Sequence, residues 1–197
     1  MNGVSRALLT LTLLLPAVAM AQQPGESQFT YTYVELGYDE ADFNPSGGEL
    51  DGDGVTISGA VELTDDWHVY AAYGEADLDA GVDLDTWTVG AGYSVPIRQN
   101  VDFYGRALYI SSDANFPGPG GDVDEDGLGI QLRVRGRVSG NGDLELEGGV
   151  QYVDVFDSDT SLQAGARYHF NDNLSAGIAI TFAGDTDGIG INARFSF

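Results

Sequence analysis

The chain has 197 residues, with 31 Asp and Glu against 8 Lys and Arg, and it contains no cysteine. A formal net charge of −23 excludes nucleic acid as a partner, because its phosphates would be repelled. The lack of cysteine excludes a disulfide framework. Twenty-eight glycines, many among apolar residues at period two, predict an all-β chain of one domain.

The first 21 residues have the pattern of a secretory signal. Arg6 supplies a positive charge, residues 7–15 an apolar core, and Ala19 and Ala21 a small-x-small cleavage site. The apolar run is too short for a transmembrane helix. We therefore expect a signal peptide over residues 1–21, export through the general secretory pathway, and a single domain over residues 22–197.

The rest of the chain alternates apolar and polar residues in ten segments, which predicts ten strands. They cover residues 29–38, 55–63, 67–74, 86–95, 101–110, 128–138, 144–153, 161–170, 174–182 and 188–197. Both parities are apolar in residues 107–110, so the facing of that part stays open. Short turns alternate with five long connections that hold 21 acids, at residues 39–54, 75–85, 111–126, 154–160 and 183–187.

The sixth strand is the most informative, because Arg133, Arg135 and Arg137 share one face while the other face is apolar. A soluble sandwich would place these arginines outside, and a membrane barrel would place them inside. A lipid-facing Arg at the membrane midplane costs about 2–4 kcal/mol. In a membrane barrel, three such residues on one strand must therefore face the lumen.

An even strand count, with short turns at one end and long loops at the other, is typical of outer-membrane barrels. The polar faces also carry Gly, Ser, Thr and Gln, which fit a crowded lumen. Aromatic residues lie near both ends of the apolar faces, as in membrane-interface girdles: Trp67, Tyr93, Phe103, Tyr168, Phe170 and Phe195 near the short turns, and Tyr38, Tyr73, Trp87 and Tyr152 near the long loops. We predict an all-β fold, a transmembrane antiparallel up-and-down β-barrel.

The turn Leu63-Thr-Asp-Asp-Trp67 and the end Arg194-Phe-Ser-Phe197 carry a family resemblance. With the signal peptide and the Gly-rich strands, they resemble small OmpA/OmpX-type outer-membrane barrels, most closely single-domain barrels of xanthomonad-type bacteria. The resemblance implies a bacterial outer-membrane location, with outer-membrane lipid and lipopolysaccharide as neighbours. It also implies that the barrel-insertion machinery reads Phe195 and Phe197, although Asn192 stands where the family prefers Gly. Known relatives have eight strands, so eight is the alternative to ten.

Opposite charges are expected to fill the lumen as one network. The hairpin of strands six and seven places Arg137 opposite Glu145 and Arg135 opposite Glu147, where opposite charges attract. We predict an ion-paired plug in the lower lumen; the alternative is a selectivity constriction of a small pore. The network comprises Glu35, Glu62, Asp102, Arg106, Arg133, Arg135, Arg137, Glu145, Glu147, Arg167 and Arg194.

Two acidic motifs resemble parts of calcium loops. Asp122, Asp124 and Asp126 form the opening D-x-D-x-D-G, but the twelfth position, which should be Glu, is Arg. Asp51 and Asp53 are similarly incomplete. A solvated acidic face, with no cofactor, is the favoured interpretation. A looser hypothesis is that these loops recruit loosely bound divalent cations that are shared with lipopolysaccharide phosphates.

The sequence does not favour an enzyme. His68 and His169 map to the lower lumen, away from the outer rim where barrel enzymes act, and Cys and Gly-x-Ser-x-Gly motifs are absent. We expect each His to bond a neighbouring carboxylate. The predicted function is a monomeric structural or surface-interaction barrel acting through acidic loops. The alternatives are a narrow channel, porin-like, and a soluble exported β-domain.

Overall fold

The computed structural model describes residues 27–43, 50–117, 121–138, 140, 142–184 and 186–197. The predicted signal peptide and its cleavage residues Ala19 and Ala21 lie outside these ranges. Ten strands make up most of the described chain: β1 Tyr33–Phe43, β2 Leu50–Glu62, β3 Trp67–Leu78, β4 Val82–Arg98, β5 Val101–Asn115, β6 Asp122–Arg137, β7 Leu144–Val155, β8 Asp157–His169, β9 Leu174–Ala183 and β10 Thr186–Ser196. Among the described residues, no helix is long and apolar enough to cross a membrane.

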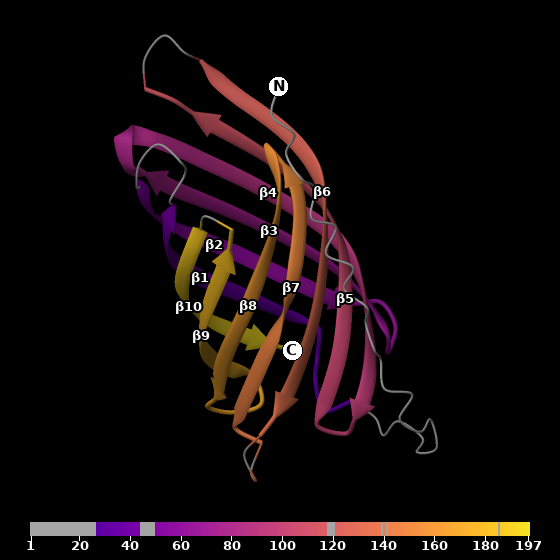
Figure 1. Cartoon of the computed structure of the whole chain (residues 1–197). Coiled ribbons are helices and arrows are strands. Elements are labelled where there is room, and N and C mark those ends of the chain that lie inside the picture. Colours follow the sequence, from indigo (N-terminus) through magenta and orange to yellow (C-terminus); the bar gives the residue numbers. More distant parts are fainter. Residues whose placement is uncertain (1–26, 44–49, 118–120, 139, 141, 185) are drawn as a thin grey trace, which may run out of the picture.

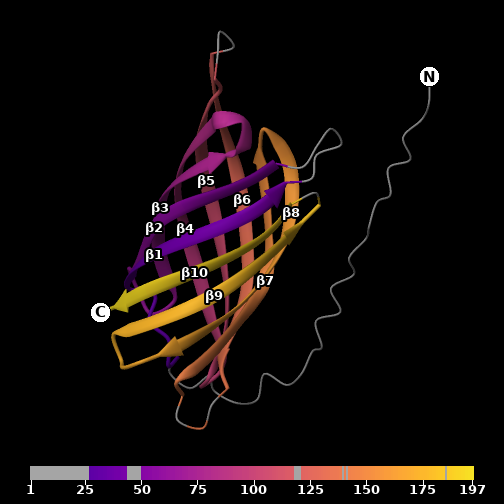
Figure 2. The ribbon, with the colours of Figure 1, turned by 90° about the vertical axis from the view of Figure 1, so that its left-hand side faces the viewer.

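Each strand pairs antiparallel with its sequence neighbours, and β1 also pairs with β10, so the sheet is a closed barrel. Figures 1 and 2 show the tilted strands of this barrel from two sides. The predicted up-and-down fold with ten strands, rather than eight, is confirmed. We call the end where β2 turns into β3 and β4 into β5 the lower end, and the opposite end the upper end.

The strand boundaries differ from the prediction at both ends. β1 begins at Tyr33 rather than Phe29, and several strands continue far into the predicted long connections. Residues 111–115, for example, pair with residues 122–126 above the apolar part of the hairpin. The backbone ladder continues there although both faces are polar, and a segment without an apolar face has no alternation that a sequence pattern can detect.

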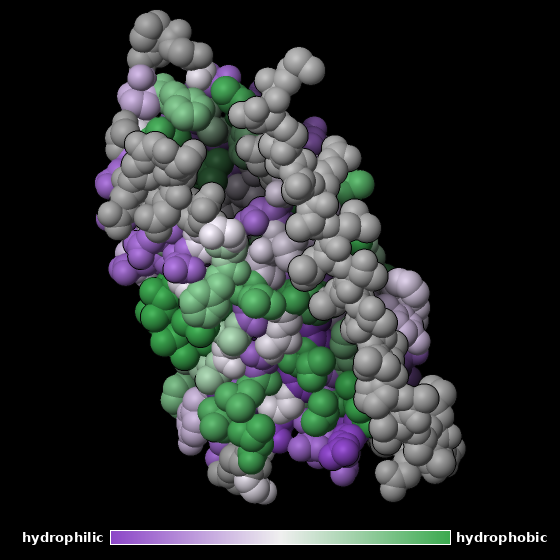
Figure 3. Space-filling view, in the orientation of Figure 1, coloured by the Kyte–Doolittle hydropathy of each residue, from purple (hydrophilic) through white to green (hydrophobic). Residues whose placement is uncertain are grey.

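Apolar and charged side chains are distributed in the opposite way to those of a soluble protein, with apolar ones outside and charged ones inside. Leu36 and Ile191 on the outer face are each 61% exposed, whereas Asp102 and His68 in the lumen are 0% and 1% exposed. Hydrophobic side chains cover much of the lower half of the face seen in Figure 3. An apolar outer surface of this extent is unfavourable in water and requires an apolar surrounding medium.

The structure also settles which way residues 107–110 face. Leu108 and Ile110 are buried in the lumen, while Tyr109 is exposed on the outer face. Residues 107–110 therefore keep the period-two alternation of the rest of β5.

Aromatic residues gather on the outer face at two heights, as predicted. Near the lower end, the rings of Trp67 and Tyr93 lie 5.0 Å apart. Toward the upper end, those of Tyr73 and Trp87 lie 4.6 Å apart. Both pairs join residues directly opposite each other on β3 and β4. Paired aromatic rings at two heights correspond to the girdles of a membrane barrel.

Candidate functional site

The lower lumen contains residues 27–32, which precede β1 and are called here the N-terminal segment. Its Phe29 and Tyr31 are 7% and 2% exposed, although neither belongs to a strand. The Ser27 hydroxyl donates to Asp102 Oδ2 at 2.6 Å, and the Tyr31 hydroxyl donates to the same oxygen at 3.4 Å. The segment therefore fills the barrel with its own side chains.

Arg135 is the centre of the contacts around the N-terminal segment. Its guanidinium carbon lies 3.9 Å from the ring centre of Tyr31 and 4.3 Å from that of Phe29. Its Nη2 donates to the carbonyl of Thr30 at 3.5 Å. A guanidinium within about 6 Å of an aromatic ring centre is attracted by the ring quadrupole. Arg135 thus holds the segment by two rings and one carbonyl.

His68 joins the N-terminal segment to the barrel wall. The Tyr31 ring stacks on His68 with ring centres 4.5 Å apart, and His68 Nε2 accepts from Arg106 Nε at 3.1 Å. Arg106 also donates to the Tyr33 hydroxyl at 3.2 Å. The prediction that each His bonds a carboxylate is thus wrong for His68, because an arginine occupies its acceptor nitrogen. His169 does lie next to a carboxylate, with Nε2 3.0 Å from an oxygen of Glu145.

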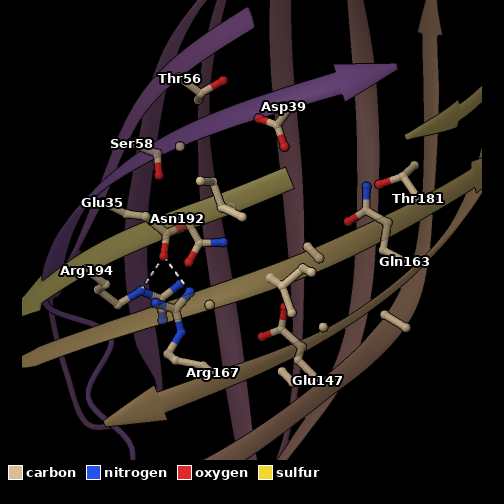
Figure 4. A pocket seen from close by; sticks show the side chains of 18 of the residues that line it. Glu35, Asp39, Thr56, Ser58, Glu147, Gln163, Arg167, Thr181, Asn192 and Arg194 are labelled. Carbon is tan, nitrogen blue, oxygen red and sulfur yellow. Dashed lines mark hydrogen bonds and ion pairs between the residues drawn. The ribbon is translucent and has the colours of Figure 1, made fainter. Parts of the chain in front are cut away.

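A second cluster in the lumen is centred on Glu35. Its Oε2 accepts from Arg167 Nη2 at 2.5 Å and from Arg194 Nε at 2.8 Å. Figure 4 shows both arginines converging on this carboxylate from β8 and β10. One acid thus serves two cations, and the remaining donors need other partners, such as the Ser175 hydroxyl at 3.3 Å from Arg167 Nη1.

Glu147 is the acid of a third cluster. It accepts from Arg133 Nη1 and, at 2.8 Å, from the Tyr104 hydroxyl. Arg133 also donates to Gln163 on β8. This cluster links four adjacent strands of the wall, β5 to β8.

The predicted register of β6 and β7 is the observed one, with Arg135 opposite Glu147 and Arg137 opposite Glu145. The side-chain partners nevertheless differ from this register. Arg135 contacts the N-terminal segment, and Glu147 binds Arg133, two residues away from the opposite position. Long arginine side chains lean along the strand and reach partners that backbone opposition does not specify.

Two further members of the predicted network lie at the lower rim. Glu62 is exposed and accepts from the backbone N–H of Tyr31 at 2.8 Å. The guanidinium of Arg137 lies 5.5 Å from the ring centre of Phe29. Both residues therefore contact the N-terminal segment.

A cavity of about 240 Å³ lies in the lumen beside the Glu35 cluster. Figure 4 shows Asp39, Thr56, Ser58, Thr181 and Asn192 around it. The lining is predominantly polar and comes largely from β1, β2 and β8 to β10, so the lumen is hollow next to the clusters that fill it.

The acids expected in the long loops stand largely on paired strands at the upper end. Glu75, Asp85, Asp113 and Asp124 are directly opposite one another across β3, β4, β5 and β6, and they form what we call the acidic row. The row lies directly above Tyr73, whose hydroxyl is 2.7 Å from Glu75 Oε1 and 2.8 Å from Asp85 Oδ1. Like charges in such positions repel each other.

The calcium-loop interpretation does not hold. Asp122, Asp124 and Asp126 belong to β6, where the backbone is extended and paired, so the motif does not form a loop. Asp51 and Asp53 likewise lie on β2. In the described ranges, no group of three or more His, Cys, Asp or Glu side chains could hold a metal ion.

The predicted insertion signal is accessible on the outer face. Phe195 is 47% and Phe197 71% exposed, and their rings lie 5.1 Å apart. The backbone N–H of Phe197 donates to the Thr32 carbonyl at 3.1 Å, which joins the two ends of the described chain.

Sequence reasoning missed the N-terminal segment as a separate element. Phe29 and Tyr31 have the parity of the lumen-facing Tyr33, which led to a predicted strand beginning at Phe29. The parity was informative about facing, but it could not distinguish a strand of the wall from a segment inside the barrel.

A family model described as "outer membrane protein beta-barrel domain" matches residues 10–195. No curated protein matches the chain. Among solved structures, Neisserial surface protein A is 16% identical with a TM-score of 0.51, over 85% of this chain and 98% of that one. An outer membrane channel from Pseudomonas putida F1 is 12% identical with a TM-score of 0.52, over 89% and 99%. The β domain of the Bordetella autotransporter BrkA is 13% identical with a TM-score of 0.50, over 84% and 99%. At these identities the likeness concerns the fold.

Proposed function

The chain belongs to the outer-membrane β-barrel family and is a barrel of the bacterial outer membrane; from this premise we propose that it is a non-enzymatic surface protein. Its lumen is filled by side chains, and its acidic upper face is the surface that meets partners. The observation that carries the proposal is the acidic row, four carboxylates opposite one another on four adjacent strands above an aromatic girdle. Its similarity in fold to barrels named as surface proteins and channels also supports this class.

The partner class follows from the position and the charge of the row. In the proposed orientation, the carboxylates above the outer girdle would stand at the height of the lipopolysaccharide phosphates, which would repel them unless cations lay between. Ca²⁺ takes six to eight oxygen ligands. Opposed pairs such as Asp85 and Asp113 supply only some of these oxygens, and lipid phosphates and water would supply the others. We infer divalent cations shared between the acidic row and lipopolysaccharide.

The experiment is a calorimetric titration of Ca²⁺ into the barrel in micelles that contain lipopolysaccharide. We expect a saturable heat that disappears in the double variant Asp85→Asn/Asp113→Asn. The matched control is Asp65→Asn/Asp172→Asn, which removes two exposed acids from turns at the lower end. No saturable heat in the wild type, or equal loss in both variants, contradicts the proposal.

Two expectations about biogenesis accompany the proposal. Export would proceed through the general secretory pathway after removal of residues 1–21, and the insertion machinery would recognise Phe195 and Phe197. We also expect the barrel to act as a monomer.

A further inference from the structure

We propose that the N-terminal segment is a displaceable plug, and that its departure opens the lumen to small hydrated ions. This inference rests on the filled lumen of the proposed function and adds that part of the filling can leave.

The N-terminal segment is not part of the barrel wall. The β1–β10 and β1–β2 ladders both begin at Tyr33, opposite Ser196 and Ala60. Residues 27–32 belong to no strand, and of their backbone groups only the Thr32 carbonyl continues the β1–β10 register, where it accepts from the Phe197 N–H at 3.1 Å. Residues 27–31 can therefore leave the lumen without breaking a backbone bond between strands, with Thr32 as the point of attachment.

Most of the contacts that fix the segment involve side chains, among them the bond from the Tyr31 N–H to Glu62 at 2.8 Å and the contact of Arg137 with the Phe29 ring. The guanidinium of Arg135 lies over the rings of Phe29 and Tyr31, and the Tyr31 ring stacks on His68. Asp102 accepts hydrogen bonds from the hydroxyls of Ser27 and Tyr31. Side-chain contacts of this kind exchange with water at modest cost, because water can hydrate the guanidinium and the carboxylate. The segment thus has a defined closed position that is held mainly by side-chain contacts.

The barrel wall behind the segment carries buried polar atoms that water could hydrate. Asp102 Oδ1, His68 Nδ1 and Arg135 Nε are buried and have no hydrogen-bond partner among the residues that the structure describes. A buried polar atom without a partner is unfavourable, so a lumen filled permanently would be expected to satisfy these three atoms. When the segment leaves, water reaches all of them.

The same polar lining continues above the segment. The cavity of about 240 Å³ beside Glu35 is bordered by charged and hydroxyl side chains of β1, β2 and β8 to β10. An emptied lower lumen would extend this hollow toward the lower end. The resulting path would be polar along its length, which suits hydrated ions.

The test is single-channel recording of the full-length protein in planar bilayers with potassium chloride. The key variant is Phe29→Ala/Tyr31→Ala, which removes both rings from Arg135. We expect the wild type to be closed and the double variant to be open at least about tenfold more often, since roughly 1.4 kcal/mol of lost contact changes an equilibrium tenfold. Gln28→Ala is the matched control, because Gln28 lies in the same segment with an exposed side chain. Tyr31→Phe keeps the ring and should stay closed.

Folding is checked separately by the heat-dependent mobility of the barrel on detergent gels. Should the double variant fail to fold, Arg135→Gln replaces it, because this change keeps both rings and removes the cation between them. A folded variant that stays closed like the wild type overturns the plug, while the filled lumen of the proposed function stands. A wild type that conducts as often as the variant overturns both. Opening by Gln28→Ala to the same extent as by the double variant also overturns the plug, because the rings would then not matter.

Discussion

At the scale of single residues, the lumen shows how a barrel accommodates six arginines in its interior. The cations have three kinds of partner: aromatic faces for Arg135, a shared carboxylate for Arg167 and Arg194, and a histidine nitrogen for Arg106. Removing one partner of a buried charge pair leaves the other charge uncompensated, which costs more than the pair itself contributes. The acids that serve several cations should therefore matter most.

Glu35→Gln should destabilise the barrel by about 3 kcal/mol, because it leaves two enclosed guanidinium groups without a negative partner. Urea unfolding in lipid vesicles, followed by the fluorescence of Trp67 and Trp87, measures this change. Glu62→Gln is the matched control, since this lumen-facing acid is exposed at the rim and should change stability far less. Equal destabilisation by the two variants would refute the role of the Glu35 cluster.

Gly92 makes room for the contact between His68 and Arg106. A Cβ added there would lie 2.2 Å from His68 Nε2 and 2.9 Å from Arg106 Cγ. Forcing an extra carbon into a filled interior costs about 1–3 kcal/mol, and Gly92→Ala should lower unfolding stability by that amount. Gly37→Ala is the control, because its nearest neighbour, an oxygen of Asp39, is 3.6 Å away. Unchanged stability of Gly92→Ala would contradict the tight packing around His68.

At the scale of elements, the strands are longer than the membrane requires. β5 and β6 pair from residue 101 to residue 136, and their upper parts carry acids above the girdle. Asp85, Asp113 and Asp124 stand directly opposite one another. Their mutual repulsion destabilises these hairpin extensions at low salt concentration.

Asp113→Asn should therefore raise the melting temperature, because it removes one of the two central charges of the acidic row. The gain should be large at 0.01 M salt and small at 1 M, where the screening length falls from about 30 Å to about 3 Å. Melting curves of both proteins at the two salt concentrations test this. Asp172→Asn, in an exposed turn at the lower end, should show little gain. A gain for Asp113→Asn that does not depend on salt would rule out repulsion as its cause.

The sequence predicted the elements where one face was apolar. In β4 and β10 the alternation predicted both the strand and its facing, because burial against lipid leaves a regular pattern. It could not predict the polar extensions of β5 and β6, nor that residues 27–32 leave the sheet, because neither has an apolar face toward lipid. The prediction of side-chain partners in the lumen had a similar limit. Register placed Arg135 opposite Glu147, but the partner of a long side chain depends on what else enters the lumen.

At the scale of the whole molecule, the protein is an inside-out barrel with a charged interior, an apolar belt and an acidic upper face. The belt lies between two aromatic girdles, and the two tryptophans of the chain stand one in each. Trp67 is 51% and Trp87 57% exposed on the outer face. In a membrane, exposed indole rings take positions at the interfaces.

The most direct test of this arrangement is tryptophan quenching in vesicles made with brominated lipids. Trp87→Phe and Trp67→Phe leave one reporter at the lower and one at the upper girdle. We predict that bromines near the lipid carbonyls quench both reporters more than bromines near the chain ends do, because each indole lies at an interface. If none of the brominated lipids quenched either reporter, the result would contradict a barrel that spans the membrane between these girdles.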